Sequence, residues 1–246
     1  MTTGVDVYLL AALGLVLIIL LWLECRPKRV YFIRHGRTLL NEQGIKQGED
    51  GGLANAGKEQ ARRVGAALIE CGISLICTSP YTRARETATI VNEYLHKPIR
   101  VTPLLSERRN PSEVVGKPVD DVAVKRVMGL TAYGYHPDSY RYADEENFED
   151  LKVRAKKCLG YLEGRSAKNI CAVTHHAFLH MLLSYMTVGD ALHADDYVKL
   201  SFFNPAENGG ITVCTYEPVK RFTSSRGWSV EVYNALAQEP ATSKTS

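Results

Sequence analysis

The fold is decided by the stretch VYFIRHGRT, residues 30–38, in which an apolar segment ends abruptly in a charged turn. Four apolar residues in a row are typical of a strand at the centre of a parallel sheet. The next residues cannot belong to a core, because two arginines flank a histidine and a glycine. Ligands of open α/β sheets bind at the carboxyl ends of the strands. The histidine between two guanidinium groups therefore indicates a phosphate-like anion site, with a basic surface turn as the alternative.

Three further apolar segments also end in polar or charged residues. Residues 75–77 precede the block SPYTRARETA, residues 79–88, in which Ser79 suits a helix N-cap and Pro80 the first helical position. The short segment 99–101 leads to Glu107, and the segment 170–174 leads into His175 and an apolar helix. Because parallel strands end at one edge of a sheet, we expect two arginine turns, a histidine turn and an acid to gather there.

This combination resembles the histidine phosphatase superfamily, the phosphoglycerate-mutase-like fold. The resemblance covers about residues 30–216. It rests on RHGRT with Asn41, Gln47 with Gly48, residues 53–57 with 60–61, the block 79–88, Glu107, and residues 173–175. With the strand pattern, it implies an α/β fold, a three-layer α/β/α sandwich with a mostly parallel central sheet.

The resemblance also implies roles for single residues. His35 would be the phosphorylated nucleophile and Glu107 the proton donor. The residues that would bind the transferring phosphoryl group are Arg34, Arg83 and His175, and Arg37 and Asn41 lie where the family contacts phosphate or substrate. A phosphomonoester dianion repels nucleophiles, so positive donors must surround it. No metal or other cofactor is required if side chains supply that charge.

Two residues depart from the family pattern, Ala54 before the first helix and His176 after the second histidine. Ala54 removes a hydroxyl cap, while the bulky ring of His176 could narrow the pocket or add a donor. His176 and His180 have the spacing of metal ligands on a helix. No carboxylate or cysteine nearby completes such a set, so a metal site is not expected.

The block 79–88 contains two arginines that cannot both point into one pocket, because positions two apart on a helix differ by about 200°. Arg83 shares its row with semi-apolar residues and suits an enclosed site. Arg85 shares its row with polar residues and suits a solvated face. The core face of this helix is predicted to run through Ala84, Ala88, Val91 and Leu95.

Residues 7–23 carry no charge and are rich in Leu, Ile and Val. This length is at the short end for crossing a bilayer. No basic residue precedes the run, whereas three lie within 26–29. These features favour an uncleaved single-pass transmembrane helix over a signal peptide, with the catalytic domain facing the cytoplasm. The basic residues beside it could meet anionic headgroups.

The predicted organisation is a tail (1–6), the anchor (7–23), a catalytic domain (28–235) with a lid-like insertion (106–147), and a disordered tail (236–246). The tyrosines of the insertion could stack on a flat substrate group, although ordinary loop packing is favoured. The net charge of +3 does not indicate nucleic acid as a partner. The cysteines have no paired short spacing and resemble buried thiols of a reducing compartment.

Our reading is a membrane-anchored phosphatase that hydrolyses phosphomonoesters through phosphohistidine. The substrate would be a phosphorylated small molecule or a phosphoprotein. A mutase is the nearest enzymatic alternative, and a phospho-ligand binding module at the membrane is an alternative of another class. A binding module would have no need of the acid Glu107. The sequence leaves the natural substrate and the oligomeric state open.

Overall fold

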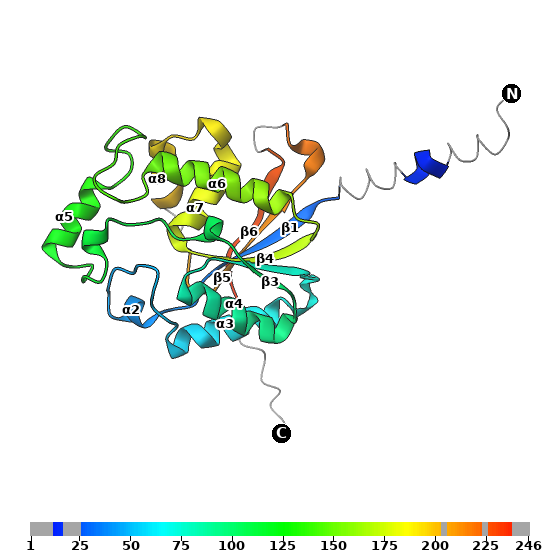
Figure 1. The fold of residues 1–246 in the computed structure, drawn as a ribbon, viewed down its shortest axis with the longest axis horizontal. Coiled ribbons are helices and arrows are strands. Elements are labelled where there is room, and N and C mark those ends of the chain that lie inside the picture. Colours follow the sequence, from blue (N-terminus) through cyan, green and yellow to red (C-terminus); the bar gives the residue numbers. More distant parts are fainter. Residues whose placement is uncertain (1–11, 17–25, 203–205, 223–225, 238–246) are drawn as a thin grey trace, which may run out of the picture.

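The computed structural model describes residues 12–16, 26–202, 206–222 and 226–237. A six-stranded sheet forms its centre, in the order β3-β2-β4-β1-β5-β6 (Figure 1). The strands are β1 (Lys28–Arg34), β2 (Leu75–Thr78), β3 (Ile99–Val101), β4 (Asn169–Thr174), β5 (Gly210–Tyr216) and β6 (Trp228–Leu236). Strands β1 to β4 are parallel, whereas β5 and β6 pair antiparallel. The predicted mostly parallel sheet is confirmed.

Strand β1 lies between β4 and β5 and is covered on both faces. Val30 and Phe32 pack into one hydrophobic cluster, and Tyr31 and Ile33 pack into another on the opposite face. All four side chains are buried. Alternation of side chains along a strand places neighbours on opposite faces, and burial on both faces explains the unbroken apolar run.

The helices cover both faces of the sheet (Figure 1). Helices α3 (Asn55–Ala67) and α4 (Thr82–Leu95) pack on one face, and α6 (Phe148–Glu163) and α7 (His176–Val188) on the other. Further helices in the described residues are α2 (Leu39–Glu42), α5 (Val122–Leu130) and α8 (Ala194–Phe202), and residues 12–16 are helical too. Short 3₁₀ turns are η1 (Ile69–Cys71), η2 (Pro103–Leu105), η3 (Ser112–Val114), η4 (Gly189–Ala191) and η5 (Pro218–Lys220).

Helix α4 has the predicted rotation. Its buried apolar residues are Ala84, Ala88, Val91 and Leu95. Arg83 is 2% exposed, whereas Arg85 is exposed to solvent. The helix begins later than expected, however, because Tyr81 is its N-cap and Thr82 its first residue. The prediction that Ser79 caps this helix is wrong.

The insertion 106–147 contains η3 and α5, which pack around a small cluster of Val114, Val124 and Val127. Its four tyrosines do not share one role. Tyr133 packs edge-on against Phe148 and Tyr197, and Tyr140 stacks on His136. The contacts of Tyr133 and Tyr140 agree with the favoured interpretation as ordinary loop packing, whereas Tyr135 is exposed to solvent.

The predicted anchor falls largely outside the described residues, which include only 12–16 of it. Among the residues that the structure describes, no helix is both long and apolar enough to cross a membrane. The predicted tail lies outside the described residues from 238 onward. Lys28 does not belong to an exposed basic flank, because it is buried and its ammonium donates to the carbonyl of Arg165.

Candidate active site

Three strands end at one edge of the sheet, and a polar residue follows each of them. His35 follows β1, Ser79 follows β2 and His175 follows β4. The backbone N–H of His35 donates to the carbonyl of Thr174 at 3.0 Å, and that of Ser79 donates to Val173 at 3.1 Å. These bonds continue the parallel ladder one residue beyond the strands. The side chains that follow are therefore held by the sheet itself.

The turn after β1 packs backbone to backbone against the start of α3. A Cβ atom on Gly36 would lie 2.4 Å from the carbonyl oxygen of Gly57, and one on Gly57 would lie 2.0 Å from that of Arg37. Both approaches are closer than any side chain permits, so both positions require glycine. The amide of Gly36 also donates to Thr87 Oγ1 of α4 at 3.1 Å. The turn that carries His35 is thus held by contacts with both α3 and α4.

The ring of His35 is oriented by its own turn. Its Nδ1 lies 2.8 Å from the carbonyl oxygen of Gly36. A carbonyl only accepts, so Nδ1 carries the proton and Nε2 keeps its lone pair. Burial and the charges of Arg83 and Arg34 hold the pKa of His35 well below its ordinary value. A nucleophilic imidazole needs an acceptor for its other N–H, and the Gly36 carbonyl is such an acceptor.

His175 is the most deeply buried ring of the site, at 0% exposure. Its Nε2 lies 2.8 Å from the hydroxyl of Ser79, and its ring centre lies 5.1 Å from that of His35. The Ser79 oxygen accepts the amide N–H of Tyr81 at 3.3 Å, which leaves the hydroxyl one proton to donate and one lone pair to accept with. When the Ser79 hydroxyl donates to Nε2, Nδ1 of His175 carries the ring proton and is a donor. Burial and the nearby His35 and Arg83 lower the pKa of His175 well below its ordinary value.

Two arginines bring positive charge to the imidazoles. Arg34 donates through Nη1 to the carbonyl of Ala206, and Arg83 donates through Nη1 to the carbonyl of Gly48 at 2.8 Å. Burial lowers the pKa of both guanidinium groups, and the charge of Glu107 opposes that effect. In the described part of the chain, three buried side-chain atoms have no hydrogen-bond partner: Arg34 Nε, Arg83 Nε and His175 Nδ1. Such groups are costly to bury, and an anion with several oxygens is the ligand that satisfies donors of this kind.

Glu107 reaches the site from the loop after η2. Its carboxylate accepts the backbone N–H groups of Ala177 at 3.2 Å and Phe178 at 3.0 Å, at the start of α7. It also accepts the N–H of Arg108 at 2.8 Å. His175 precedes this helix and offers no side-chain cap. The acid therefore caps the helix that begins beside His175, where the helix dipole favours negative charge.

A cavity of about 510 Å³ lies beside Arg83 and Glu107, and its wall does not include His35, His175 or Arg34. Its wall includes Arg83, Glu107 and Tyr81, together with residues 47–50 and the start of the insertion. The ring of Tyr81 meets that of His175 edge-on at 5.1 Å, and the Arg83 guanidinium lies 5.0 Å from its centre. This volume falls in the range of pockets that hold small molecules.

The two less certain candidates have other surroundings. Arg37 is exposed, and its backbone N–H donates to Gln60 Oε1 at 2.9 Å. Asn41 forms a capping box with Thr38 at the start of α2, each side chain bonding the other's backbone N–H. Neither residue belongs to the wall of the 510 Å³ cavity.

Sequence reasoning missed Ser79 and Tyr81 as members of the site. Both lie in the four residues before Arg83, just after a strand that was predicted to lead to the site. That position was the available signal. For Ser79, the preference of serine for helix N-caps suggested a structural role instead.

His176 and His180, which have the spacing of metal ligands, lie side by side on α7. Its Nδ1 lies 3.4 Å from the carbonyl of Ala206, and its ring lies 4.7 Å from that of His180. Burial lowers the pKa of both rings, that of His180 to about 4. The described residues include no group of three or more side chains that could hold a metal ion.

Comparison with known proteins agrees with this geometry. The profile of the histidine phosphatase superfamily (branch 1) matches residues 30–226. The uncharacterised phosphatase PhoE of Bacillus subtilis (strain 168) is 34% identical over 163 residues, which are 65% of this chain and 78% of that protein.

Solved structures share the fold. A mycobacterial glucosyl-3-phosphoglycerate phosphatase superimposes with a TM-score of 0.68 at 19% identity, over 85% of this chain and 99% of the other. YhfR of Bacillus stearothermophilus superimposes with a TM-score of 0.69 at 24% identity, over 83% and 96%. At such identities the likeness concerns the fold alone. With the profile match and the phosphatase relative, it follows that this chain belongs to branch 1 of the histidine phosphatase superfamily and is a phosphatase.

Proposed function

We propose that the protein hydrolyses phosphomonoesters through a phosphohistidine formed on His35. The observation that carries the proposal is the ring geometry: the Gly36 carbonyl holds Nδ1–H at 2.8 Å, so Nε2 is left with its lone pair in a buried, positively charged site. An imidazole whose proton is fixed on one nitrogen can attack with the other.

In the first step, Nε2 of His35 forms a bond to phosphorus while the ester P–O bond breaks. Glu107 gives a proton to the departing alkoxide. The unpaired donors of Arg34, Arg83 and His175 stabilise the charge that spreads over the equatorial oxygens. In the second step, water attacks phosphorus and the N–P bond breaks. Glu107 takes a proton from that water, and inorganic phosphate leaves.

The cavity supports a small phosphorylated metabolite as the substrate rather than a phosphoprotein. Its volume of about 510 Å³ suits a small molecule. Its wall carries both signs of charge, from Arg108 and Arg109 and from Glu49, Asp50 and Asp144. A substrate with both hydroxyl or amine donors and anionic groups beyond the ester fits such a wall.

The nucleophile is tested by His35→Ala. We expect no turnover from this variant and a folded chain by circular dichroism, because the ring lies at a strand end. Brief incubation of the wild-type protein with labelled substrate should leave phosphate that is labile in acid and stable in base. Substantial turnover by folded His35→Ala would refute the phosphohistidine mechanism.

We also propose that residues 7–23 anchor the enzyme in a membrane, with the catalytic domain on the cytoplasmic side. The uncharged run and the exposed Arg26 and Arg29 behind it support this proposal. The full chain should float with vesicles in a sucrose gradient. A chain that begins at Lys28 should remain active and stay in the bottom fractions of the gradient, without the vesicles. A full chain that does not float would overturn the anchor.

A further inference from the structure

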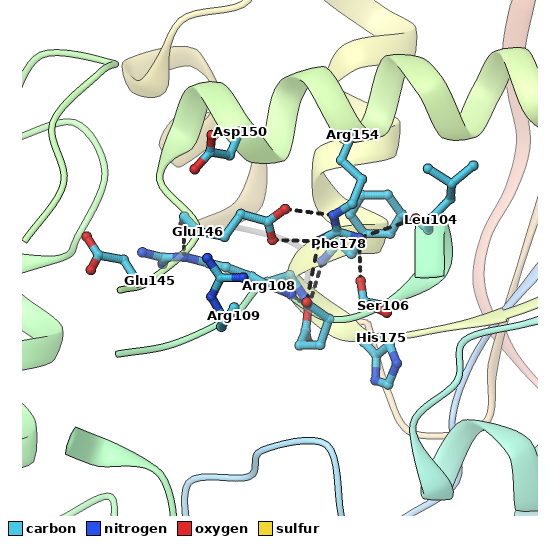
Figure 2. Close-up of polar contacts among 12 residues, drawn as sticks. Leu104, Ser106, Arg108, Arg109, Glu145, Glu146, Asp150, Arg154, His175 and Phe178 are labelled. Atoms are coloured by element: carbon cyan, nitrogen blue, oxygen red, sulfur yellow. Dashed lines mark hydrogen bonds and ion pairs between the residues drawn. The ribbon is translucent and has the colours of Figure 1, made fainter. Parts of the chain in front are cut away.

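Arg154 of α6 makes five hydrogen bonds around the predicted acid. Its Nε and Nη2 donate to the two carboxylate oxygens of Glu146 at 2.7 and 2.6 Å. Its Nη1 donates to the carbonyls of Ser106 at 2.7 Å and Leu104 at 3.2 Å, and Nη2 reaches that of Glu107 at 3.4 Å. Figure 2 shows this fork between the helix and the loop. One guanidinium therefore holds three backbone carbonyls of the loop that ends in Glu107.

The same guanidinium also supports the other side of the acid. It lies over the ring of Phe178, 3.9 Å from the ring centre (Figure 2). The backbone N–H of Phe178 donates to Glu107 Oε1 at 3.0 Å. Arg154 thus contacts both the backbone that carries the carboxylate and the residue that holds it. A planar group with five fixed donors can do this, whereas an ammonium cannot.

Glu146 completes the arrangement. The Arg154 and Glu146 side chains are only 15% and 13% exposed, so each charge needs the other. The backbone N–H of Glu146 donates to the carbonyl of Arg109 at 2.9 Å, two residues after the acid. The pair therefore holds the chain on both sides of Glu107.

The attachment of α6 to the sheet does not depend on this pair. The buried residues of the helix are Phe148, Leu151, Ala155, Cys158, Leu159 and Leu162. They form part of the main hydrophobic cluster, with strands β1 and β4. Loss of the arginine would leave this apolar contact in place, so its effect should fall on the loop.

We propose that Arg154, with Glu146 as its counterion, is a positioning residue that aligns Glu107 for proton transfer to the leaving group. This inference rests on the proposed function. It assigns Arg154 no contact with substrate. Arg154 instead holds the loop that carries Glu107 close to the start of α7, where the backbone N–H of Phe178 binds the carboxylate.

The test compares kcat/KM for two substrates of the full-length protein, p-nitrophenyl phosphate and an alkyl phosphate. The first has a leaving group that departs without a proton, and the second requires one. For Arg154→Met, which keeps an apolar chain over Phe178, we expect the alkyl phosphate to lose about 10–100-fold, a part of what general acids provide. We expect p-nitrophenyl phosphate to change by less than about threefold. Because misfolded protein lowers both rates equally, the ratio of the two rates does not depend on the folded fraction.

A matched control is Arg165→Met. Arg165 also lies over an aromatic ring, 4.3 Å from the centre of Tyr161, and donates to a carbonyl at 3.2 Å. It has no contact with the acid loop, and its variant should keep the wild-type ratio. Arg154→Lys retains the charge without the fork and should fall between Arg154→Met and wild type. On the alkyl phosphate, Arg154→Met should add little to the loss caused by Glu107→Gln, because both remove one function.

Equal losses on the two substrates would overturn the inference, and so would additive losses in the double variant. A wild-type protein that hydrolyses neither substrate would instead count against the proposed function. If Glu107→Gln alone left the ratio unchanged in an active enzyme, Glu107 would not be the acid and Arg154 could not act through it.

Discussion

Ser79→Ala offers a direct check of how the second histidine is held. The hydroxyl lies 2.8 Å from Nε2 of His175, and both side chains are 0% exposed. Its removal leaves a buried imidazole acceptor without a partner, which costs about 1–3 kcal/mol. It also removes the bond that keeps the proton on Nδ1, the atom we expect to face the phosphoryl group. If the transition state bears that full cost, kcat/KM falls by about 5–150-fold.

The assay is steady-state hydrolysis of p-nitrophenyl phosphate, with urea unfolding as a check on stability. Thr78→Val is the matched control, because Thr78 is also buried at the end of β2 and its hydroxyl donates to the Ser79 carbonyl at 3.2 Å. That hydroxyl has no contact with the imidazole, so its loss should affect stability but leave kcat/KM within about threefold. Unchanged kcat/KM in Ser79→Ala, or the same loss in Thr78→Val, would refute this account of His175.

Two other measurements test the charges of the site. Arg83→Ala should lower kcat/KM by about 10²–10³-fold, as for loss of one preorganised donor, while Arg85→Ala, two residues along the same helix but exposed, stays within a few-fold. The reverse ranking would mean that the other face of α4 binds the phosphate. The pH dependence of stability tests the lowered pKa of His35. Below the unfolded-state pKa of about 6.5, the unfolded chain binds a proton at this imidazole that the folded chain excludes, so the free energy of unfolding decreases as pH falls. His35→Ala should make the decrease between pH 6 and 5 shallower by about 1 kcal/mol, measured by urea unfolding at both pH values. An unchanged slope would contradict burial of a neutral ring.

Local sequence signals predicted the elements that carry the site. The apolar run of β1 is continuous because both faces of the strand are covered, and the charged turn follows directly after the strand. The periodicity of α4 separated Arg83 from Arg85 because a residue's angle on a helix depends only on its position. These inferences succeeded because the forces involved act between near neighbours in the chain.

Other features depend on partners distant in sequence. The antiparallel strands β5 and β6 were not predicted individually. Which strand pairs with the free side of β1 depends on how the whole sheet assembles, and local sequence does not show this. Lys28 looked like part of a basic flank, but the carbonyl of Arg165, far along the chain, gives its buried ammonium a partner. Ser79 looked like a helix cap, but its hydroxyl is hydrogen-bonded to His175, which lies 96 positions away in the sequence.

The sequence by itself determined the parallel strands, the charged turns at their ends, and the residue types that phosphate chemistry needs. Those properties follow from local apolar patterning and from the chemistry of each side chain. Only the tertiary structure decided which nitrogen of His35 carries its proton, which hydroxyl His175 binds, and which helix start and which arginine hold Glu107. A proton's position and a carboxylate's orientation depend on the atom opposite, and that atom comes from another part of the chain.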